Sequence, residues 1–138
     1  FMLLALLQKG FGNDIDLNCA EKMLYGANWA YDLKLTPEAL KLAAGFGGGM
    51  GVESICGAIT GGIMVLSHLY VKQRSHESNR IKELETEFIE TFKNEMGCID
   101  CKCLKEKYRN DEIKCSLVIF KAAEILDRII ARESARTE

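Results

Sequence analysis

Apolar residues recur along most of the chain at the spacing of an amphipathic helix, whereas alternating patterns typical of strands are scarce. One run of apolar positions lies in the middle of the chain, at Ile81, Leu84, Phe88 and Phe92. A second run with the same spacing lies near the C-terminus, at Val118, Ala122, Ile125 and Ile129. Such runs predict helices that bury one face, so the fold class predicted is all-α.

Two helix starts are marked by capping residues. Asn18, with Glu21 three positions later, matches a capping box and predicts a helix over 19–31. The segment Thr36–Glu38 places a Thr at the N-cap and a Pro at the first helical position, and predicts a helix over 37–44. Both signals satisfy backbone N–H groups that would otherwise lack a partner at a helix start.

The remaining segments complete a helical bundle. Further helices are expected over 1–9, 52–73, 79–96 and from about 110 onward, with a polar break at 74–78 and a cysteine-rich connection at 98–108. Together they predict a compact bundle of about five to six helices around a central Gly-containing helix, with residues 1–138 as one domain. Trp29 and Tyr31 are expected to pack in its core.

The central segment from Ser54 to Val71 carries no formal charge if His68 is neutral, and its length borders on that of a membrane span. Because it also contains polar residues and three glycines, we interpret it as a buried helix. Apolar residues make up 48% and charged residues 28% of the chain, as in a soluble globular protein. The net charge of −2 gives no basic surface for nucleic acid or anionic membrane, so neither is expected as a partner. We also expect a cytoplasmic location.

Glycines stand inside the central helix where they weaken it. Gly57 and Gly61 lie one turn apart, and each glycine in a helix interior costs about 1 kcal/mol relative to Ala. Their presence implies that another helix, a second subunit or a cofactor comes close to this backbone. Packing against a helix of the same chain is the favoured interpretation, and a homodimer through the glycine face is an alternative.

A glycine-rich loop, residues 45–51, precedes the central helix. It does not fit the dinucleotide fingerprint, because Met50 stands where the last glycine is required, and it lacks the Gly-Lys-Ser/Thr of a P-loop. Its backbone N–H groups would still suit an anion. Gly47, Gly48 and Gly49 are therefore candidate cofactor-binding residues.

Six cysteines are the unusual feature of the composition: Cys19, Cys56, Cys98, Cys101, Cys103 and Cys115. A group of this kind in a cytosolic chain indicates metal binding or redox chemistry more often than structural disulfides. Cys19 falls in the first turn of a capped helix, where the helix dipole is expected to lower the pKa of its thiol. The cluster from Cys98 to Cys103 suits zinc or an iron–sulfur cluster by residue type, but its spacing matches neither pattern well.

The order of these landmarks resembles that of the bacterial and archaeal C-GCAxxG-C-C family, whose members are labelled redox-active. The resemblance runs from Asn18-Cys19-Ala20-Glu21 through the glycine loop and Cys56-Gly57-Ala58 with Gly61 to two later cysteines, or about residues 18–130. It implies that the family cysteines are Cys19, Cys56, Cys101 and Cys115, and that Cys98 and Cys103 are additions. Some members carry selenocysteine, which implies redox chemistry. A related domain occurs in a multihaem cytochrome, but haem-attachment motifs are absent here.

Two functional hypotheses follow for the same four residues. In the first, Cys19 and Cys56 are activated thiols and Cys101 and Cys115 are their resolving partners or a second pair, acting on a redox partner protein or a small thiol. In the second, the four thiolates bind zinc or an iron–sulfur cluster. A dimeric helical interaction module without catalysis is a third possibility.

Overall fold

The computed structural model describes residues 1–137, and over that range it is all-helical, as the sequence predicts. Seven α-helices are present in the described chain, slightly more than the five to six predicted. Their bounds are α1 Met2–Gln8, α2 Cys19–Ala30, α3 Pro37–Leu40, α4 Gly57–Tyr70, α5 Arg80–Met96, α6 Cys101–Tyr108 and α7 Ser116–Thr137. Short non-α turns lie at Lys41–Phe46, Gly49–Glu53 and Ser75–Glu77.

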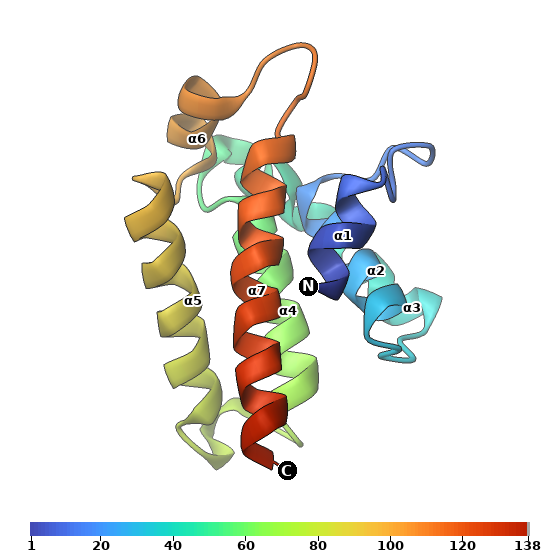
Figure 1. Cartoon of the computed structure of the whole chain (residues 1–138), viewed down its shortest axis with the longest axis vertical. Helices are drawn as coiled ribbons and strands as arrows, with labels where there is room; N and C mark the ends of the chain where they lie inside the picture. Colours follow the sequence, from blue (N-terminus) through green and yellow to red (C-terminus); the bar gives the residue numbers. More distant parts are fainter. Residues whose placement is uncertain (138) are drawn as a thin grey trace.

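Figure 1 shows α4, α5 and α7 as the long helices of the bundle, with α1, α2 and α3 on one side of them. The buried apolar residues of these helices form one continuous core. The predicted apolar positions of α5 and α7 face it: Ile81, Leu84, Phe88, Phe92, Val118, Ala122, Ile125 and Ile129 are all buried. Amphipathic periodicity alone therefore identifies the buried face of two of the three long helices.

The glycines of α4 let this helix lie directly against α2 and α5. A Cβ atom on Gly61 would lie 2.7 Å from the carbonyl oxygen of Ala20, and one on Gly62 would lie 2.5 Å from the ring of Phe88. Both distances are shorter than real Cβ contacts, so only glycine permits the packing. The predicted close packing of helices within one chain is confirmed, and the glycine face is covered by α2 and α5 of the same chain.

Several boundaries differ from the prediction, and two of them are helix ends: α3 ends at Leu40 and not at 44, and α4 ends at Tyr70 and not at 73. The central helix begins at Gly57 and not at 52, because the preceding segment has left-handed backbone at Gly49, Met50, Gly51 and Glu53. Such angles interrupt a right-handed helix. Glu53 therefore lies outside the helix, and its carboxylate pairs with Lys105 at 3.6 Å.

The cysteine-rich connection at 98–108 was expected to be irregular, but residues 101–108 form α6. The last helix begins at Ser116 and not near 110, because the side chain of Asn110 accepts hydrogen bonds from the N–H groups of Glu112 and Ile113 and closes a separate turn. Figure 1 shows α6 across the end of the bundle at which α4 and α7 begin.

One expected core residue lies at the surface. Trp29, on α2, is 74% exposed, so its assignment to the core is wrong. Tyr31 packs partly against the core, and its hydroxyl donates a hydrogen bond to the buried carboxylate of Asp127. In the described part of the chain, no helix has the combination of length and apolar character that a membrane span requires.

Candidate functional site

The four family cysteines all lie at helix starts. Cys19 is the first residue of α2, Cys56 is the N-cap of α4, and Cys101 is the first residue of α6. Cys115 immediately precedes α7. None of the four is in a disulfide, so each is available as a thiol.

A short pairing of two loops brings Cys56 and Cys101 together. The backbone N–H of Cys56 donates to the carbonyl of Ile99 at 2.9 Å, and the N–H of Cys101 donates to the carbonyl of Ser54 at 2.6 Å. These bonds flank an isolated antiparallel bridge between Ile55 and Asp100. The bridge fixes the entrance of α6 against the entrance of α4.

Glycines bring the other neighbours close. A Cβ on Gly57 would lie 3.2 Å from the Cβ of Cys19, so the residue after Cys56 sits directly against Cys19. A Cβ on Gly49 would lie 2.8 Å from the Cβ of Cys101. The two glycines therefore allow the starts of α2, α4 and α6 to meet at one end of the bundle.

The capping box at Asn18 holds this arrangement in place and is confirmed. Its side-chain oxygen accepts from the N–H of Glu21 at 2.9 Å, and the Glu21 carboxylate accepts from the N–H of Asn18 at 3.0 Å. The amide of Asn18 also donates to the carbonyl of Ala44 at 2.9 Å. One residue thus caps α2 and binds the segment that leads into the glycine loop.

Three of the four cysteines line one pocket of about 510 Å³, a volume within the range of small-molecule sites. Cys19, Cys101 and Cys115 line it, whereas Cys56 lies beneath the surface and is 4% exposed. The walls come from the loop before α2, from α6, and from the turn that precedes α7.

Cys19 and Cys115 form a hydrogen-bonded pair within this pocket. The Cys19 thiol donates to the Cys115 sulfur, and this bond is the main cause that lowers the pKa of Cys115 to about 6. The positive charges of Arg109, Lys105 and Lys22 act in the same direction, while burial opposes them. The surroundings of Cys115 therefore favour its thiolate form.

The same interaction raises the pKa of Cys19, because ionisation would remove the proton that the Cys115 thiolate accepts. Burial and the nearby sulfurs of Cys56, Cys115 and Cys101 raise it further. The prediction that the helix start would lower the pKa of Cys19 is therefore wrong. The dipole of one helix is a smaller effect than a direct bond to a neighbouring thiolate.

The other two cysteines are held as thiols by their surroundings. Burial raises the pKa of Cys56 to about 11, although its sulfur accepts from the N–H groups of Ala58 and Ile59. Burial also raises the pKa of Cys101, against the influence of Lys105. The expectation that Cys56 is an activated thiol is wrong for the same reason: desolvation disfavours the charged form.

Cys98 and Cys103 are joined to each other by a disulfide, with 6.4 Å between their Cα atoms. The bond closes the short segment around Cys101 and leaves Cys101 itself free. The disulfide therefore joins the first and the last cysteine of the Cys98–Cys103 cluster and bypasses Cys101. The sequence analysis missed this bond.

Two further predictions concern bound groups. Among the described residues, no set of three or more Cys, His, Asp or Glu side chains is arranged to hold one metal ion. Of the candidate anion-binding glycines Gly47, Gly48 and Gly49, Gly48 lines the cysteine pocket. Gly47 packs against the Asn18 side chain and Gly49 against Ser54, so their places serve packing.

The basic residues of the pocket were missed by the sequence analysis. Lys22 follows Cys19 by three positions on α2, and Lys105 follows Cys101 by four positions on α6. At these spacings two side chains share one face of a helix. The sequence could therefore have placed Lys22 beside Cys19, because the helix over 19–31 was predicted. It could not have placed Lys105 beside Cys101, because residues 98–108 were not predicted to be helical.

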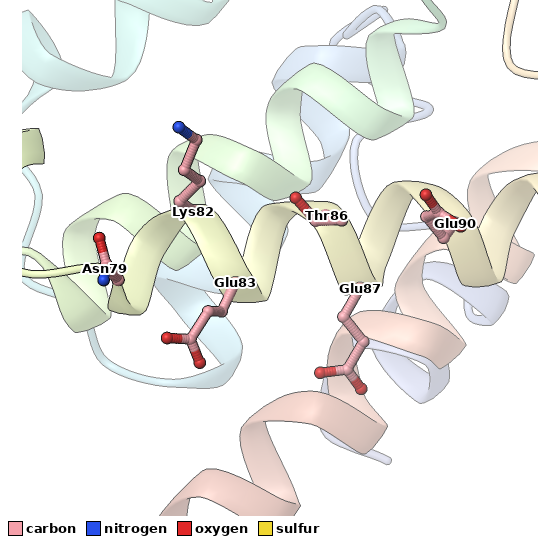
Figure 2. A pocket seen from close by; sticks show the side chains of 6 residues that line it. All are labelled: Asn79, Lys82, Glu83, Thr86, Glu87 and Glu90. Atoms are coloured by element: carbon pink, nitrogen blue, oxygen red, sulfur yellow. The ribbon is translucent and has the colours of Figure 1, made fainter.

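A second depression runs along α5 and contains no cysteine. Figure 2 shows its six side chains on that helix and at its N-cap, namely Asn79, Lys82, Glu83, Thr86, Glu87 and Glu90. Within it, Glu87 binds the guanidinium of Arg132 at 2.5 and 2.8 Å. A ring nitrogen of His68, on α4, lies 3.1 Å from the carbonyl oxygen of Leu33.

The comparisons with known proteins agree with the cysteine pattern. No curated protein and no solved structure matches the chain. Residues 17–129 match the family described as "Putative redox-active protein (C_GCAxxG_C_C)". The match covers most of the chain, from the residue before the capping box to the middle of α7, and includes all four free cysteines. The chain therefore belongs to the C_GCAxxG_C_C family.

Proposed function

We propose that this protein carries out thiol–disulfide exchange, with Cys115 as the attacking thiolate and Cys19 as the resolving thiol. The observation that carries the proposal is that Cys19 and Cys115 are free cysteines lining the same open pocket, where the ionisation of each affects the other. One sulfur holds the negative charge and the other the proton. This is the division of roles that two-step exchange requires.

In the first step, the Cys115 thiolate attacks one sulfur of a substrate disulfide. A bond forms between Cys115 and that sulfur, the substrate S–S bond breaks, and the other half leaves as a thiolate that takes up a proton from water. The leaving half must reach solvent, and Cys115 is only partly buried, so it has a path through the pocket.

In the second step, Cys19 loses its proton to water and attacks the Cys115 sulfur. The mixed disulfide breaks, the second half of the substrate leaves as a thiol, and a Cys19–Cys115 disulfide remains. The substrate disulfide has gained two electrons and the protein dithiol has lost two. The reverse reaction regenerates the dithiol at the expense of cellular thiols, which suits a reducing compartment such as the cytoplasm.

Loss of the negative charge from Cys115 helps the second step. Once Cys115 is in a mixed disulfide it no longer accepts a proton from Cys19, so the main cause of the raised Cys19 pKa is removed. Cys19 then lies at the first turn of α2, where backbone N–H groups stabilise its thiolate. The resolving thiol is thus activated only after the attack has taken place.

Mass spectrometry of the reduced protein after oxidation by a small neutral disulfide tests the proposal. We expect a new disulfide between Cys19 and Cys115 in the wild type, and a stable mixed disulfide on Cys115 in Cys19→Ser. Cys101→Ser is the matched control, because it removes a pocket thiol outside the pair, and it should still form the Cys19–Cys115 bond. If Cys115 stays unmodified in the wild type and in Cys19→Ser, the proposal is overturned.

A further inference from the structure

The pocket that contains the cysteine pair has an excess of positive charge. Its lining includes four basic side chains and two carboxylates: Lys22, Lys105, Arg109, Lys114, Asp16 and Glu112. These sum to +2, whereas the whole chain has a net charge of −2. Even with Cys115 ionised, the lining keeps an excess of one positive charge. Basic residues are therefore concentrated here against the overall trend of the molecule.

Most of these cations are not neutralised by partners. Among the described residues, neither Arg109 nor Lys114 makes an ion pair, and Lys22 donates to the neutral amide of Asn13 at 2.7 Å. Lys105 faces Glu53 at 3.6 Å, but that carboxylate is half exposed and the pair is loose. Exposed pairs of this kind contribute little and are easily exchanged for another anion.

From this charge distribution we infer that the substrate is a small disulfide whose two halves carry carboxylate groups. The inference rests on the proposed exchange at Cys115 and adds the substrate class. A volume of about 510 Å³ fits a small molecule and not a folded protein surface. Guanidinium and ammonium groups on the wall bind carboxylates through charge-assisted hydrogen bonds.

The position of the cations suits this role. Arg109, Lys105 and Lys22 line the same pocket as Cys115 and are close enough to act on its charge, so they lie near the attacking sulfur. A carboxylate held by these groups places the adjoining disulfide near Cys115. The same three side chains therefore serve both the nucleophile and the recognition of the substrate.

Three disulfides of similar size and different charge test the inference: dithiodipropionate is anionic, hydroxyethyl disulfide is neutral and cystamine is cationic. The rate constant for oxidation of the reduced protein is measured with each. We expect dithiodipropionate to react about tenfold faster than cystamine at low salt, and the ratio to shrink at high salt, since charged pockets raise association rates by factors of this order.

Variants assign the preference to the pocket. In Arg109→Gln and Lys105→Gln, the ratio of the dithiodipropionate rate to the hydroxyethyl disulfide rate should fall severalfold. This ratio cancels any change in the thiolate fraction of Cys115, because both probes react with the same sulfur. Lys82→Gln, on the exposed face of α5 in Figure 2, removes one positive charge elsewhere and should leave the ratio unchanged.

The outcomes separate the two proposals. If hydroxyethyl disulfide oxidises the Cys19–Cys115 pair but the three probes react at equal rates, or cystamine reacts fastest, the substrate class is wrong and the exchange function stands. If none of the probes oxidises the pair, both are wrong. Arg109 is exposed and Lys105 is half-buried, so neither substitution should disturb the core. The circular dichroism spectrum of each variant is therefore expected to match that of the wild type, which confirms its fold.

Discussion

At the scale of single residues, the proposed exchange depends on two thiols whose ionisation is linked. Cys115 gains a proton donor in Cys19, and Cys19 keeps its proton because Cys115 is charged. Both cysteines stand at helix starts, yet the pKa is lowered for Cys115 and raised for Cys19. Position at a helix start is therefore not enough to lower the pKa of a cysteine, because the neighbouring thiol has the larger effect.

Alkylation of Cys115 should follow a titration with a midpoint at about pH 6, since only the thiolate reacts with iodoacetamide. In Cys19→Ala the midpoint should move to higher pH, because the main cause of the lowered pKa is removed. Cys19→Ser retains a hydroxyl donor and should shift less. The rate is measured by peptide mass spectrometry between pH 5 and pH 9. An unshifted midpoint in Cys19→Ala would contradict the assigned hydrogen bond.

The linked pair also makes stability depend on pH, in two directions. The lowered pKa of Cys115 contributes stability that is lost as pH falls from the unfolded value of about 9 through 6. The raised pKa of Cys19 contributes stability that is lost as pH rises above about 9. Relative to Cys19→Ala/Cys115→Ala, the wild type should therefore gain unfolding free energy from pH 6 to pH 9 and lose it above. Denaturant titrations across this range measure the difference, and a flat difference would contradict the linkage.

At the scale of secondary-structure elements, the family motif is explained by helix packing. Gly57 lets α4 approach Cys19, and Gly61 lets it approach Ala20 one turn further along α2. Cys56 itself is held by the bridge to the start of α6. The glycines that accompany the cysteine therefore position it, and they contribute no group to the chemistry.

Gly61→Ala should destabilise the fold although Ala is the better helix former. The new methyl group would lie 2.7 Å from the backbone oxygen of Ala20, and overpacking of this kind costs about 1–3 kcal/mol, more than the roughly 1 kcal/mol gained in helix propensity. Gly45→Ala is a matched control, because nothing lies within 4 Å of its added Cβ. Urea unfolding measures both, and equal effects would contradict the packing role.

The disulfide between Cys98 and Cys103 stabilises the start of α6 and not the reactive pair. Its removal in Cys98→Ser/Cys103→Ser should lower stability by about 2 kcal/mol, the loop-closure value for a short loop. Because neither residue lines the cysteine pocket, the pH midpoint of Cys115 alkylation should stay unchanged. A shifted midpoint would show that the bond also shapes the pocket. Wild-type protein treated with dithiothreitol should show the same loss of stability.

At the scale of the whole molecule, sequence patterns were sufficient for the fold class, the capped helix starts and the family, and insufficient for the surroundings of each cysteine. Periodicity and capping are local properties, so α2 and α5 were predicted to within one residue at each end. Those surroundings depend on which sulfurs meet, and that is decided by contacts between distant segments. Cys19 and Cys115 are neighbours only because the bundle brings the starts of α2 and α7 to the same end.

The α1 helix shows the same dependence on distant contacts, because its cap comes from the other end of the chain. The buried carboxylate of Asp127, on α7, accepts from the backbone N–H groups of Leu3 and Leu4 at 3.2 and 2.9 Å, and from the hydroxyl of Tyr31. One side chain thus joins α1, the end of α2 and α7. Nothing in the local sequence of α1 indicates this cap, since Phe1 provides no side-chain acceptor.

Asp127→Ala should therefore destabilise the whole bundle. It removes three hydrogen bonds to a buried charged acceptor and leaves their donors unpaired, and each such bond contributes about 1.5–3 kcal/mol, so a loss of at least about 3 kcal/mol is expected. Tyr31→Phe removes one of the three and should cost less. Both are measured by thermal and denaturant unfolding. Because Asp127 lies outside the cysteine pocket, the folded fraction of either variant should still show the wild-type midpoint of Cys115 alkylation. A shift in that midpoint would mean that the position of α7, and with it the contact between Cys19 and Cys115, is set from the α1 side of the bundle.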